Sequence, residues 1–315
     1  IRLSLVGSEM CIRDRSCVSS ILWDHFTPIS LTRQFRTVHQ EFIQWASQLG
    51  YGIDSDGMVH DGPWRVTFPS WFDCYDGTDQ DVFNIMKSTF DPLLTDPMAM
   101  AANQIICFTH ETATQHNDYL ANHAARAMNA PVRTMKAINS AVKVTSDIAS
   151  AMATPEFIDA VDLHSLPPTH LHFFEGCIVA LHRNIDVTRG LTNGAKLIVQ
   201  KIGIFVIRVK VISNGIVADI PRMKLSAKAS NGIEFERLQF PVKLAYAITS
   251  NRSQGQTFSN KVIIDCRSPS FAHGQLYVAC TRATDPNNII IVGAPMQQAI
   301  AVTYQDLIIR SHDVY

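Results

Sequence analysis

The part of the sequence that most constrains the fold is FPVKLAYAITSNRSQGQTF, which runs from Phe240 to Phe258. Its first half alternates larger apolar side chains with others from Val242 to Ile248, the pattern of a strand with one buried face. Its second half, Thr249 to Thr257, is polar and has no aliphatic side chain. Ligands of open α/β sheets bind beyond the carboxyl ends of strands. The stretch therefore predicts a strand leading into a binding loop, with an ordinary polar loop as the alternative.

A second segment, GQLYVACTR from Gly274 to Arg282, makes the interpretation more specific. The first stretch resembles motif V of superfamily-one DNA helicases, and the second resembles motif VI. The resemblance is to the PIF-type family, named for petite integration frequency, which also supplies the helicase part of Helitron transposons. A third block, LTRQFRT, places Arg36 at that family's arginine position. His110 and Arg252 depart from the asparagine and lysine usual in the family.

The resemblance implies an α/β fold: a RecA-like, P-loop NTPase-type second motor domain with a parallel sheet, carrying an inserted small antiparallel SH3-like β-module. Residues 4–15, SLVGSEMCIRDR, read like translated sequencing adapter and are expected to be foreign. Five segments follow from this interpretation. They are a non-native leader (1–15), the end of the first motor domain and a linker (16–103), the first part of the second RecA-like domain (104–154), the inserted β-rich module (155–238) and the second part of that RecA-like domain (239–315).

Composition describes a globular protein and excludes several classes. Hydrophobic residues make up 46% of the 315 residues and charged residues 17%, typical of a chain with a core and not of a disordered one. No apolar run approaches the roughly 18 residues needed to span a bilayer, so no membrane partner is expected. Seven cysteines form no CxxC pair, which favours reduced thiols in the cytosol or nucleus. With the family resemblance, an intracellular protein of the nucleus, or of the mitochondrion, is expected. His170 and His172 share a strand face, but no further ligands complete a metal site.

Periodicity predicts the order of the elements along the chain. The first expected elements are a helix with Phe42, Trp45 and Leu49 on one face, a loop over residues 53–77, and a helix within residues 78–94 with Val82, Ile85, Met86 and Phe90 as its apolar stripe. A strand at 104–109 follows, and then a helix that is capped by Thr112 and runs to about Met128. The last expected elements are strands at 261–266 and 288–292 with a helix between them, and a closing helix at 295–309.

The segment from 155 to 238 has a different character. Asn-Gly pairs at 193–194, 214–215 and 231–232 separate alternating apolar runs, a pattern that predicts hairpins. Between residues 181 and 228 there are nine Lys or Arg and two Asp, in a chain of net charge −1. Arg208 and Lys210 share one strand face and are predicted to bind nucleic acid, with a solvated strand face as the alternative. Phe205 and Phe235 are the only aromatic candidates for base stacking, so backbone contact is the expected mode.

The resemblance and phosphate chemistry together assign roles to single residues. A planar guanidinium binds two phosphate oxygens at once, so Arg282 is the first choice for an arginine finger and Arg36 the second. Gln254 and Gly255 are expected to face the phosphates. Gln275 and Tyr277 are placed near the nucleotide, with a core role for Tyr277 equally open. The residues expected to contact nucleic acid in motif V and after the first strand are Thr249, Ser250, Asn251, Arg252, Thr109, His110 and Asn117.

Two expected motifs are absent from the sequence. No G-x-x-x-x-G-K-[ST] occurs, and no Asp-Glu pair follows an apolar strand. In the family, these groups bind ATP and Mg²⁺ and lie in the first motor domain, so the main phosphate and Mg²⁺ ligands are expected outside this chain. We therefore expect the carboxyl-terminal part of an ATP-dependent 5′–3′ DNA helicase, inactive alone, whose partners are its missing amino-terminal motor domain and single-stranded or fork DNA.

Three interpretations of function follow. The helicase of the first would serve DNA repair, recombination and telomere or genome maintenance, or Helitron transposition. The second is a non-enzymatic, single-stranded nucleic-acid-binding remnant of a decayed transposon. The third is a structural α/β protein whose motif matches arise by chance, which motif order and spacing disfavour.

Overall fold

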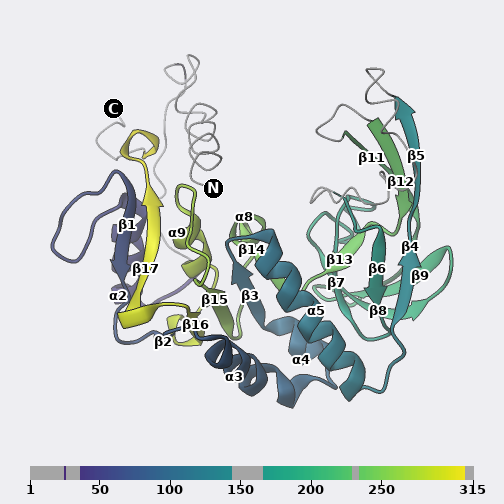
Figure 1. Ribbon diagram of the computed structural model, residues 1–315, viewed down its shortest axis with the longest axis horizontal. Helices are drawn as coiled ribbons and strands as arrows, with labels where there is room; N and C mark the ends of the chain where they lie inside the picture. Colours follow the sequence, from purple (N-terminus) through teal and green to yellow (C-terminus); the bar gives the residue numbers. More distant parts are fainter. Residues whose placement is uncertain (1–24, 26–35, 144–165, 229–233, 309–315) are drawn as a thin grey trace. The chain divides into compact units, whose positions relative to one another are not determined.

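The computed structural model describes residues 25, 36–143, 166–228 and 234–308, and the expected leader lies outside them (Figure 1). These residues form two compact units. Unit 1 combines residues 1–89, 102–113 and 248–315, and unit 2 combines residues 90–101 and 114–247. Each unit is thus assembled from segments that are distant in the sequence. None of the helices in the described ranges has the length and apolar character needed to cross a membrane.

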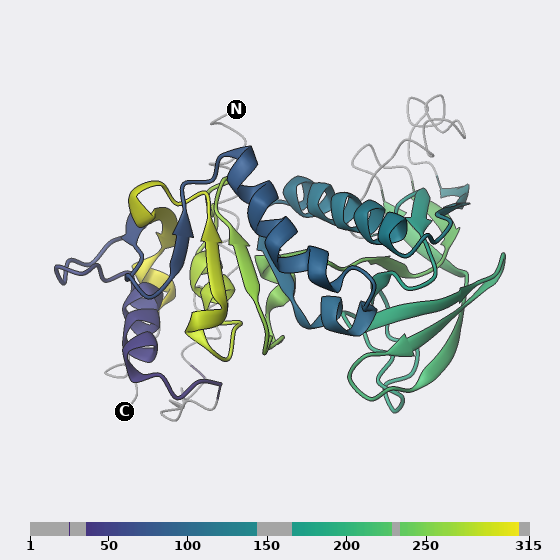
Figure 2. The ribbon, with the colours of Figure 1, turned by 90° about the horizontal axis from the view of Figure 1, so that it is seen from below.

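A five-stranded sheet organises unit 1, in the order β14-β3-β15-β16-β2. The β3–β15, β15–β16 and β16–β2 pairs are parallel, so the carboxyl ends of these strands lie at one edge of the sheet (Figure 2). Strands β3, β15 and β16 are buried along their whole lengths, as expected for a parallel sheet covered on both faces. The strands are β2 (Asp73–Tyr75), β3 (Gln104–Cys107), β14 (Ala247–Thr249), β15 (Val262–Asp265) and β16 (Ile289–Val292).

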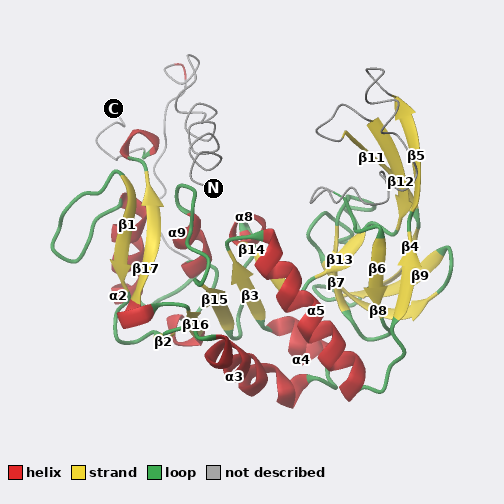
Figure 3. Ribbon diagram, viewed as in Figure 1, coloured by secondary structure: helices red, strands yellow, loops and turns green. Residues whose placement is uncertain are grey.

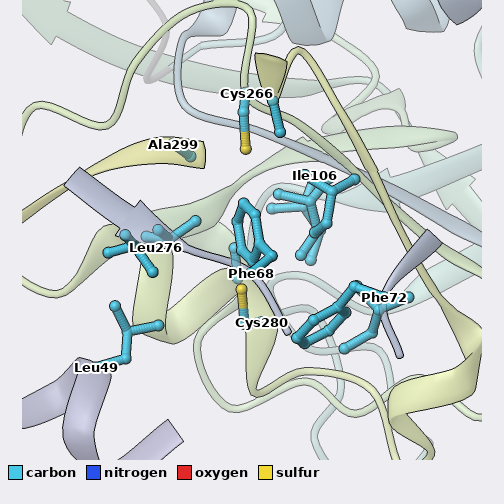
Figure 4. Packing of buried hydrophobic residues seen from close by; sticks show 14 of the residues in the cluster. Leu49, Phe68, Phe72, Ile106, Cys266, Leu276, Cys280 and Ala299 are labelled. Atoms are coloured by element: carbon cyan, nitrogen blue, oxygen red, sulfur yellow. The ribbon is translucent and has the colours of Figure 1, made fainter. Parts of the chain in front are cut away.

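Side chains from strands, helices and loops form one hydrophobic cluster in unit 1. Leu49 comes from α2 (Gln40–Tyr51), Leu276 from α9 (Gln275–Cys280) and Ile106 from β3, and all three are buried (Figure 4). The predicted stripe of the helix α3 (Asp79–Phe90) is also buried, which confirms the amphipathic pattern. Gly52 ends α2 in the left-handed conformation that favours glycine.

The end of the chain differs from the sequence prediction. The expected closing helix is wrong, because residues 298–303 form the strand β17 (Gln298–Thr303), antiparallel to β1 (Gly62–Thr67). Trp64 in β1 donates its indole N–H to the Thr303 hydroxyl at 3.1 Å. The predicted loop over 53–77 therefore contains two strands, β1 and β2. Both errors have one cause: β1 and β17 pair across more than two hundred residues, and local periodicity cannot report such pairing.

Unit 2 consists mainly of antiparallel sheet and contains most of the helices α4 (Pro97–Ala102) and α5 (His110–Ala127) (Figure 3). The Asn-Gly pairs at 193–194 and 214–215 lie between paired strands, as predicted, whereas 231–232 lies outside the described residues. The sheets have the orders β10-β9-β8-β7-β13, β11-β12-β5 and β4-β6. Their strands are β4 (Arg133–Lys136), β5 (Ile138–Lys143), β6 (His170–Phe173), β7 (Ile178–Leu181), β8 (Lys196–Ile202), β9 (Val206–Val211), β10 (Val217–Pro221), β11 (Met223–Lys228), β12 (Glu234–Gln239) and β13 (Val242–Leu244).

The strand predicted before the polar turn is divided in two. Val242–Leu244 is β13 and pairs with β7, whereas Ala247–Thr249 is β14 and belongs to the parallel sheet. Between them, the backbone N–H groups of Tyr246 and Ala247 donate to the Oδ1 atom of Asn117, at 2.8 and 2.9 Å. A side chain thus replaces the strand ladder at this point, which the alternating pattern could not reveal.

The helix α5 begins at His110, two residues before the predicted cap. The hydroxyl of Thr109 accepts the backbone N–H of Thr112 at 3.2 Å and hydrogen-bonds the Thr112 hydroxyl at 2.8 Å. Thr109 therefore caps the helix, and Thr112 is its partner.

Candidate functional site

The predicted binding loop folds into a short helical turn followed by an exposed corner. After β14 the chain forms α8 (Ser250–Ser253), in which the Ser253 hydroxyl donates to the Ser250 carbonyl oxygen at 2.7 Å. Gly255 follows with φ of 78°, in the left-handed region, and a Cβ atom there would meet open space. Backbone conformation, rather than crowding, therefore favours glycine at this corner.

Motif VI is bonded directly to this loop. The Ser250 hydroxyl donates to the Gln275 carbonyl oxygen at 2.7 Å, and the Gln275 side chain accepts the N–H groups of Phe271 and Ala272 at 3.0 and 3.2 Å. The Gln275 amide also donates to the Asn251 side chain at 3.4 Å. Gln275 is buried, so it links the loop before α9 to α8 rather than facing a nucleotide, which corrects its predicted role.

Two arginines from distant segments meet at the end of α9. Arg36 donates from NH1 to the Thr281 carbonyl oxygen at 2.7 Å and from Nε to the Thr257 hydroxyl at 3.2 Å. Arg282 donates from Nε to the Val278 carbonyl oxygen at 2.8 Å and from NH2 to the Thr281 hydroxyl at 3.0 Å. We call Arg36 and Arg282 the arginine pair. The two residues chosen as arginine-finger candidates are thus brought to the same residue, Thr281.

Within the described ranges, neither member of the arginine pair binds a carboxylate: their hydrogen-bond partners are hydroxyl and carbonyl oxygens. Arg282 is buried. Burial lowers the pKa of its guanidinium, and the nearby charge of Arg36 lowers that pKa further. A buried cation beside a second cation is unfavourable unless an anion balances the charge. The arrangement fits a bound anion with several oxygens, such as a phosphate chain.

The structure divides the remaining motif V and motif VI candidates by exposure. Asn251, Arg252, Gln254 and Gly255 are exposed, so these positions remain available to a ligand. Thr249 and Ser250 are buried, which contradicts a direct role of these two side chains in gripping DNA. Tyr277 packs against the hydrophobic cluster and against Gly50, where a Cβ atom would lie 3.3 Å from its ring. Of the two roles left open for Tyr277, the structure supports the core role.

The candidates around the start of α5 also differ in their exposure to solvent. Thr109 is half-buried and His110 is exposed. Asn117 is buried, and besides its two acceptor bonds its amide donates to the Ala247 carbonyl oxygen at 2.9 Å. The polar atoms of Asn117 thus hold the backbone at the start of β14. They serve the fold, and not the predicted nucleic-acid contact.

One group of charges was missed from the sequence. The carboxylate of Asp265, at the carboxyl end of β15, has a fully buried side chain and pairs with Arg267 at 2.7 Å. Arg267 also reaches the exposed carboxylate of Asp79 at 2.8 Å, and these carboxylates raise its pKa. The available signal was an acidic residue ending an apolar strand, followed by an arginine. The pair lies at the sheet edge where ligands of such folds bind.

In unit 2 the strand β9 has the predicted two faces. Ile207 and Val209 are buried, and Arg208 and Lys210 lie on the other face. Arg208 forms a two-pronged pair with Asp219, Nε to Oδ1 at 2.8 Å and NH2 to Oδ2 at 3.0 Å. This contact lowers the pKa of Asp219 and raises that of Arg208. The charge of Arg208 is therefore largely matched inside the protein.

The two aromatic stacking candidates of unit 2 lie in opposite environments. Phe235 is buried, with the Arg237 guanidinium 5.7 Å from its ring centre. Phe205 is 75% exposed. The structure therefore excludes Phe235 and leaves Phe205.

Comparison with known proteins shows similarity to DNA helicases of the Pif1 type. Residues 156–202 match the family model described as DNA helicase Pif1, 2B domain. A curated relative, the ATP-dependent DNA helicase PIF1 of Danio rerio, is 36% identical over 136 residues, which cover 41% of this chain and 20% of the relative. The PIF1 protein of Homo sapiens is 32% identical over 138 residues, 42% of this chain and 20% of that protein.

Solved structures support the fold. A Pif1 structure described as the basis for DNA unwinding at forked dsDNA by two coordinating helicases has a TM-score of 0.56 at 22% identity, covering 97% of this chain and 59% of that chain. A Bacteroides Pif1 in complex with ADP-AlF3 and ssDNA gives 0.56 at 21% identity, covering 96% and 60%. The chain thus spans about three-fifths of these structures and matches about a fifth of the two curated relatives. The expected RecA-like α/β fold with antiparallel sheets is confirmed.

Proposed function

Because this chain is related to the Pif1-type DNA helicases, we propose that it forms the second motor domain of an ATP-dependent DNA helicase, in which the arginine pair binds the γ-phosphate of ATP. ATP supplies the phosphoryl group whose transfer releases the energy for unwinding. Transfer of this group gathers negative charge on its outer oxygens, and guanidinium groups stabilise that charge.

The observation that carries this proposal is that the arginine pair binds no carboxylate among the described residues. Thr281 fixes both side chains, so their guanidinium groups are held before a ligand arrives. Such fixed donors act more strongly than flexible ones because no reorganisation is needed when charge develops. The pair fits a polyphosphate but would repel Mg²⁺. We accordingly place the acidic Mg²⁺ ligands and the P-loop of the working helicase in its first motor domain, since neither motif occurs in this sequence.

The exposed residues beside the arginine pair support a second contact in the same loop. Asn251, Arg252, Gln254 and Gly255 are exposed; in this proposal Asn251 and Arg252 contact the DNA strand, and Gln254 and Gly255 face the phosphates. The Ser250 hydroxyl donates to the Gln275 carbonyl oxygen and the Gln275 amide donates to the Asn251 side chain, and these bonds tie the loop to α9, which ends at the arginine pair. Hydrolysis of the bound nucleotide can thereby change the positions of the residues that are proposed to bind DNA. We propose 5′–3′ movement along single-stranded or fork DNA, in the nucleus or mitochondrion, serving genome maintenance or Helitron transposition.

The phosphate site is tested by thermal unfolding of this chain in the presence of tripolyphosphate. A ligand that binds only the folded state raises the melting temperature by mass action. We expect the melting temperature to rise with tripolyphosphate concentration, and this rise to disappear in Arg282→Met and Arg36→Met. A rise of the same size in both variants would show that the anion binds elsewhere and would refute the assignment of the arginine pair.

A second candidate function is nucleic-acid binding without catalysis. It is favoured by the absence of a P-loop motif from the sequence, and it predicts single-strand binding that ATP leaves unchanged. Binding of a labelled oligonucleotide with and without ATP, in a fusion carrying the P-loop domain of a Pif1 relative, separates the two. A nucleotide-dependent affinity supports the helicase, and an affinity independent of nucleotide supports the remnant.

A further inference from the structure

The hairpin between β8 and β9 in unit 2 breaks the usual rules of turn chemistry. The Gly203 N–H donates to the Val206 carbonyl oxygen at 2.9 Å, which leaves Ile204 and Phe205 as the two corner residues. Two-residue hairpin corners favour asparagine, aspartate and glycine, because their backbone angles suit those residues. Here Ile204 and Phe205 take the two corner positions, and neither adopts the positive φ angle of such turns. Local rules are most often broken where a site has a function.

The same corner exposes apolar surface. Ile204 is 69% exposed, Phe205 75% and Val206 41%. An apolar side chain that stays exposed to water contributes no burial free energy to folding. A cluster of three such side chains is typical of an interaction surface. We call residues 204–206 the apolar corner.

The backbone of the apolar corner is held in place from two sides. The Arg222 N–H donates to the Phe205 carbonyl oxygen at 3.0 Å, and Arg133 donates to the Ile202 carbonyl oxygen at 3.2 Å. Gly203 allows the tight closure, because a Cβ atom there would lie 2.7 Å from the Val206 carbonyl oxygen. Phe205 is therefore presented on a fixed backbone, so little ordering is needed when a ligand binds.

The charges around the apolar corner select the partner. Arg133 and Lys201 are exposed beside it, and Arg133 donates to the Ile202 carbonyl oxygen. The Glu175 carboxylate accepts the Ile202 N–H at 3.3 Å, and the Asp219 carboxylate is paired with Arg208, which lies opposite Lys201. An aromatic ring flanked by exposed cations fits a nucleobase whose phosphates lie on the cations. A neutral apolar protein surface would leave those charges unmatched.

We propose that Phe205 stacks on an unpaired base of single-stranded nucleic acid, with Arg133 and Lys201 contacting the flanking phosphates. This deepens the proposed function, because it rests on DNA binding by the chain and identifies where unit 2 reads an unpaired strand. Arg208 lies opposite Lys201 in the β8–β9 pair, but its charge is matched by Asp219, so we assign the phosphate contact to Lys201.

The experiment compares two oligonucleotides of equal length, oligo(dT) and an abasic strand, by fluorescence anisotropy with the full chain. Stacking one base on an aromatic ring changes affinity by about fivefold or more. Phe205→Ala is expected to weaken oligo(dT) binding by at least about fivefold and to leave abasic-strand binding unchanged. Phe205→Trp is expected to keep wild-type affinity. Val187→Ala is the matched control, because Val187 is 69% exposed in the same unit.

Each outcome decides the matter. If wild type binds oligo(dT) and Phe205→Ala binds it equally well, stacking by Phe205 is refuted while DNA binding by the chain stands. Equal weakening toward both oligonucleotides, or failure of Phe205→Trp to restore affinity, also refutes stacking. If the wild-type protein binds neither oligonucleotide, both the stacking proposal and the proposed DNA-binding function are refuted. A change of oligomeric state in Phe205→Ala, seen by sedimentation, would show that the corner contacts a second copy instead.

Discussion

Arg36 and Arg282 bind the same residue, Thr281, the first at its carbonyl oxygen and the second at its hydroxyl. The two arginines are separated by almost the whole described chain, and their common partner holds both guanidinium groups at the end of α9. Their mutual repulsion, added to the burial of Arg282, stores unfavourable charge energy that a bound phosphate would offset.

Replacing Arg282 should separate stability from activity. Arg282→Met removes a buried cation that pairs with no carboxylate in the described part of the chain, so we expect the melting temperature to stay the same or rise. In a fusion that supplies the P-loop domain of a Pif1 relative, Arg282→Lys is expected to lower kcat for ATP hydrolysis by about 10³-fold, because lysine lacks the two-pronged contact. Unchanged hydrolysis by Arg282→Lys would contradict the assignment.

The buried pair of Asp265 and Arg267 should behave in the opposite way. Arg267→Met removes the guanidinium that pairs with the fully buried Asp265 carboxylate, at a cost of about 3 kcal/mol in the free energy of unfolding. Urea unfolding measures this loss. Asp79→Asn serves as the control, because the Asp79 side chain is almost fully exposed and its pairing contributes little. Comparable losses in the two variants would show that burial does not set the strength of this network.

Asn117 is expected to be a strong determinant of stability. Asn117→Ala leaves the buried N–H groups of Tyr246 and Ala247 without acceptors, which we expect to cost about 2 to 4 kcal/mol. Equilibrium unfolding of the variant checks this. Asn117→Asp keeps an acceptor for both N–H groups and should lose less. Equal losses in the two variants would contradict the importance of these acceptor bonds.

Asp219→Asn should strengthen binding to single strands by releasing Arg208. We expect the slope of log K against log salt to steepen by about 0.7, the value for one additional phosphate contact on a single strand. The slope is measured by titrating a labelled oligonucleotide at several salt concentrations. Arg208→Gln in the Asp219→Asn background is the control and should return the slope to that of wild type. An unchanged slope in Asp219→Asn alone would show that Arg208 does not reach the DNA.

The buried thiols should make the folded protein sensitive to alkaline pH. Burial raises the pKa of Cys177 to about 12 and that of Cys74 to about 11. The unfolded chain releases these protons near pH 9, so deprotonation favours the unfolded state above that pH. Stability should therefore fall as the pH rises from about 9 toward about 12. Melting temperatures across this range check the slope, and Cys177→Ala should flatten it. At pH 8, iodoacetamide should modify Cys177 only in urea.

The sequence by itself identified the elements whose side chains repeat locally. The stripe of α3 and the alternating faces of β9 were predicted because burial of one face imposes a period of about 3.6 or 2 residues on the side chains. The Asn-Gly turn before β10 was predicted because positive backbone angles favour those residues. The resemblance of motifs V and VI to PIF-type helicases selected Arg282, and the LTRQFRT block selected Arg36.

Only the tertiary structure decided which of these residues act together. Strand β17 exists because β1 lies beside it, and the break between β13 and β14 exists because Asn117 binds the backbone there. The meeting of Arg36 with Arg282, the pairing of Arg208 with Asp219 and the exposure of Phe205 depend on segments that are distant in the chain or on the shape of a hairpin corner. Such contacts leave no local period in the sequence, because each depends on which surfaces the folded chain brings together.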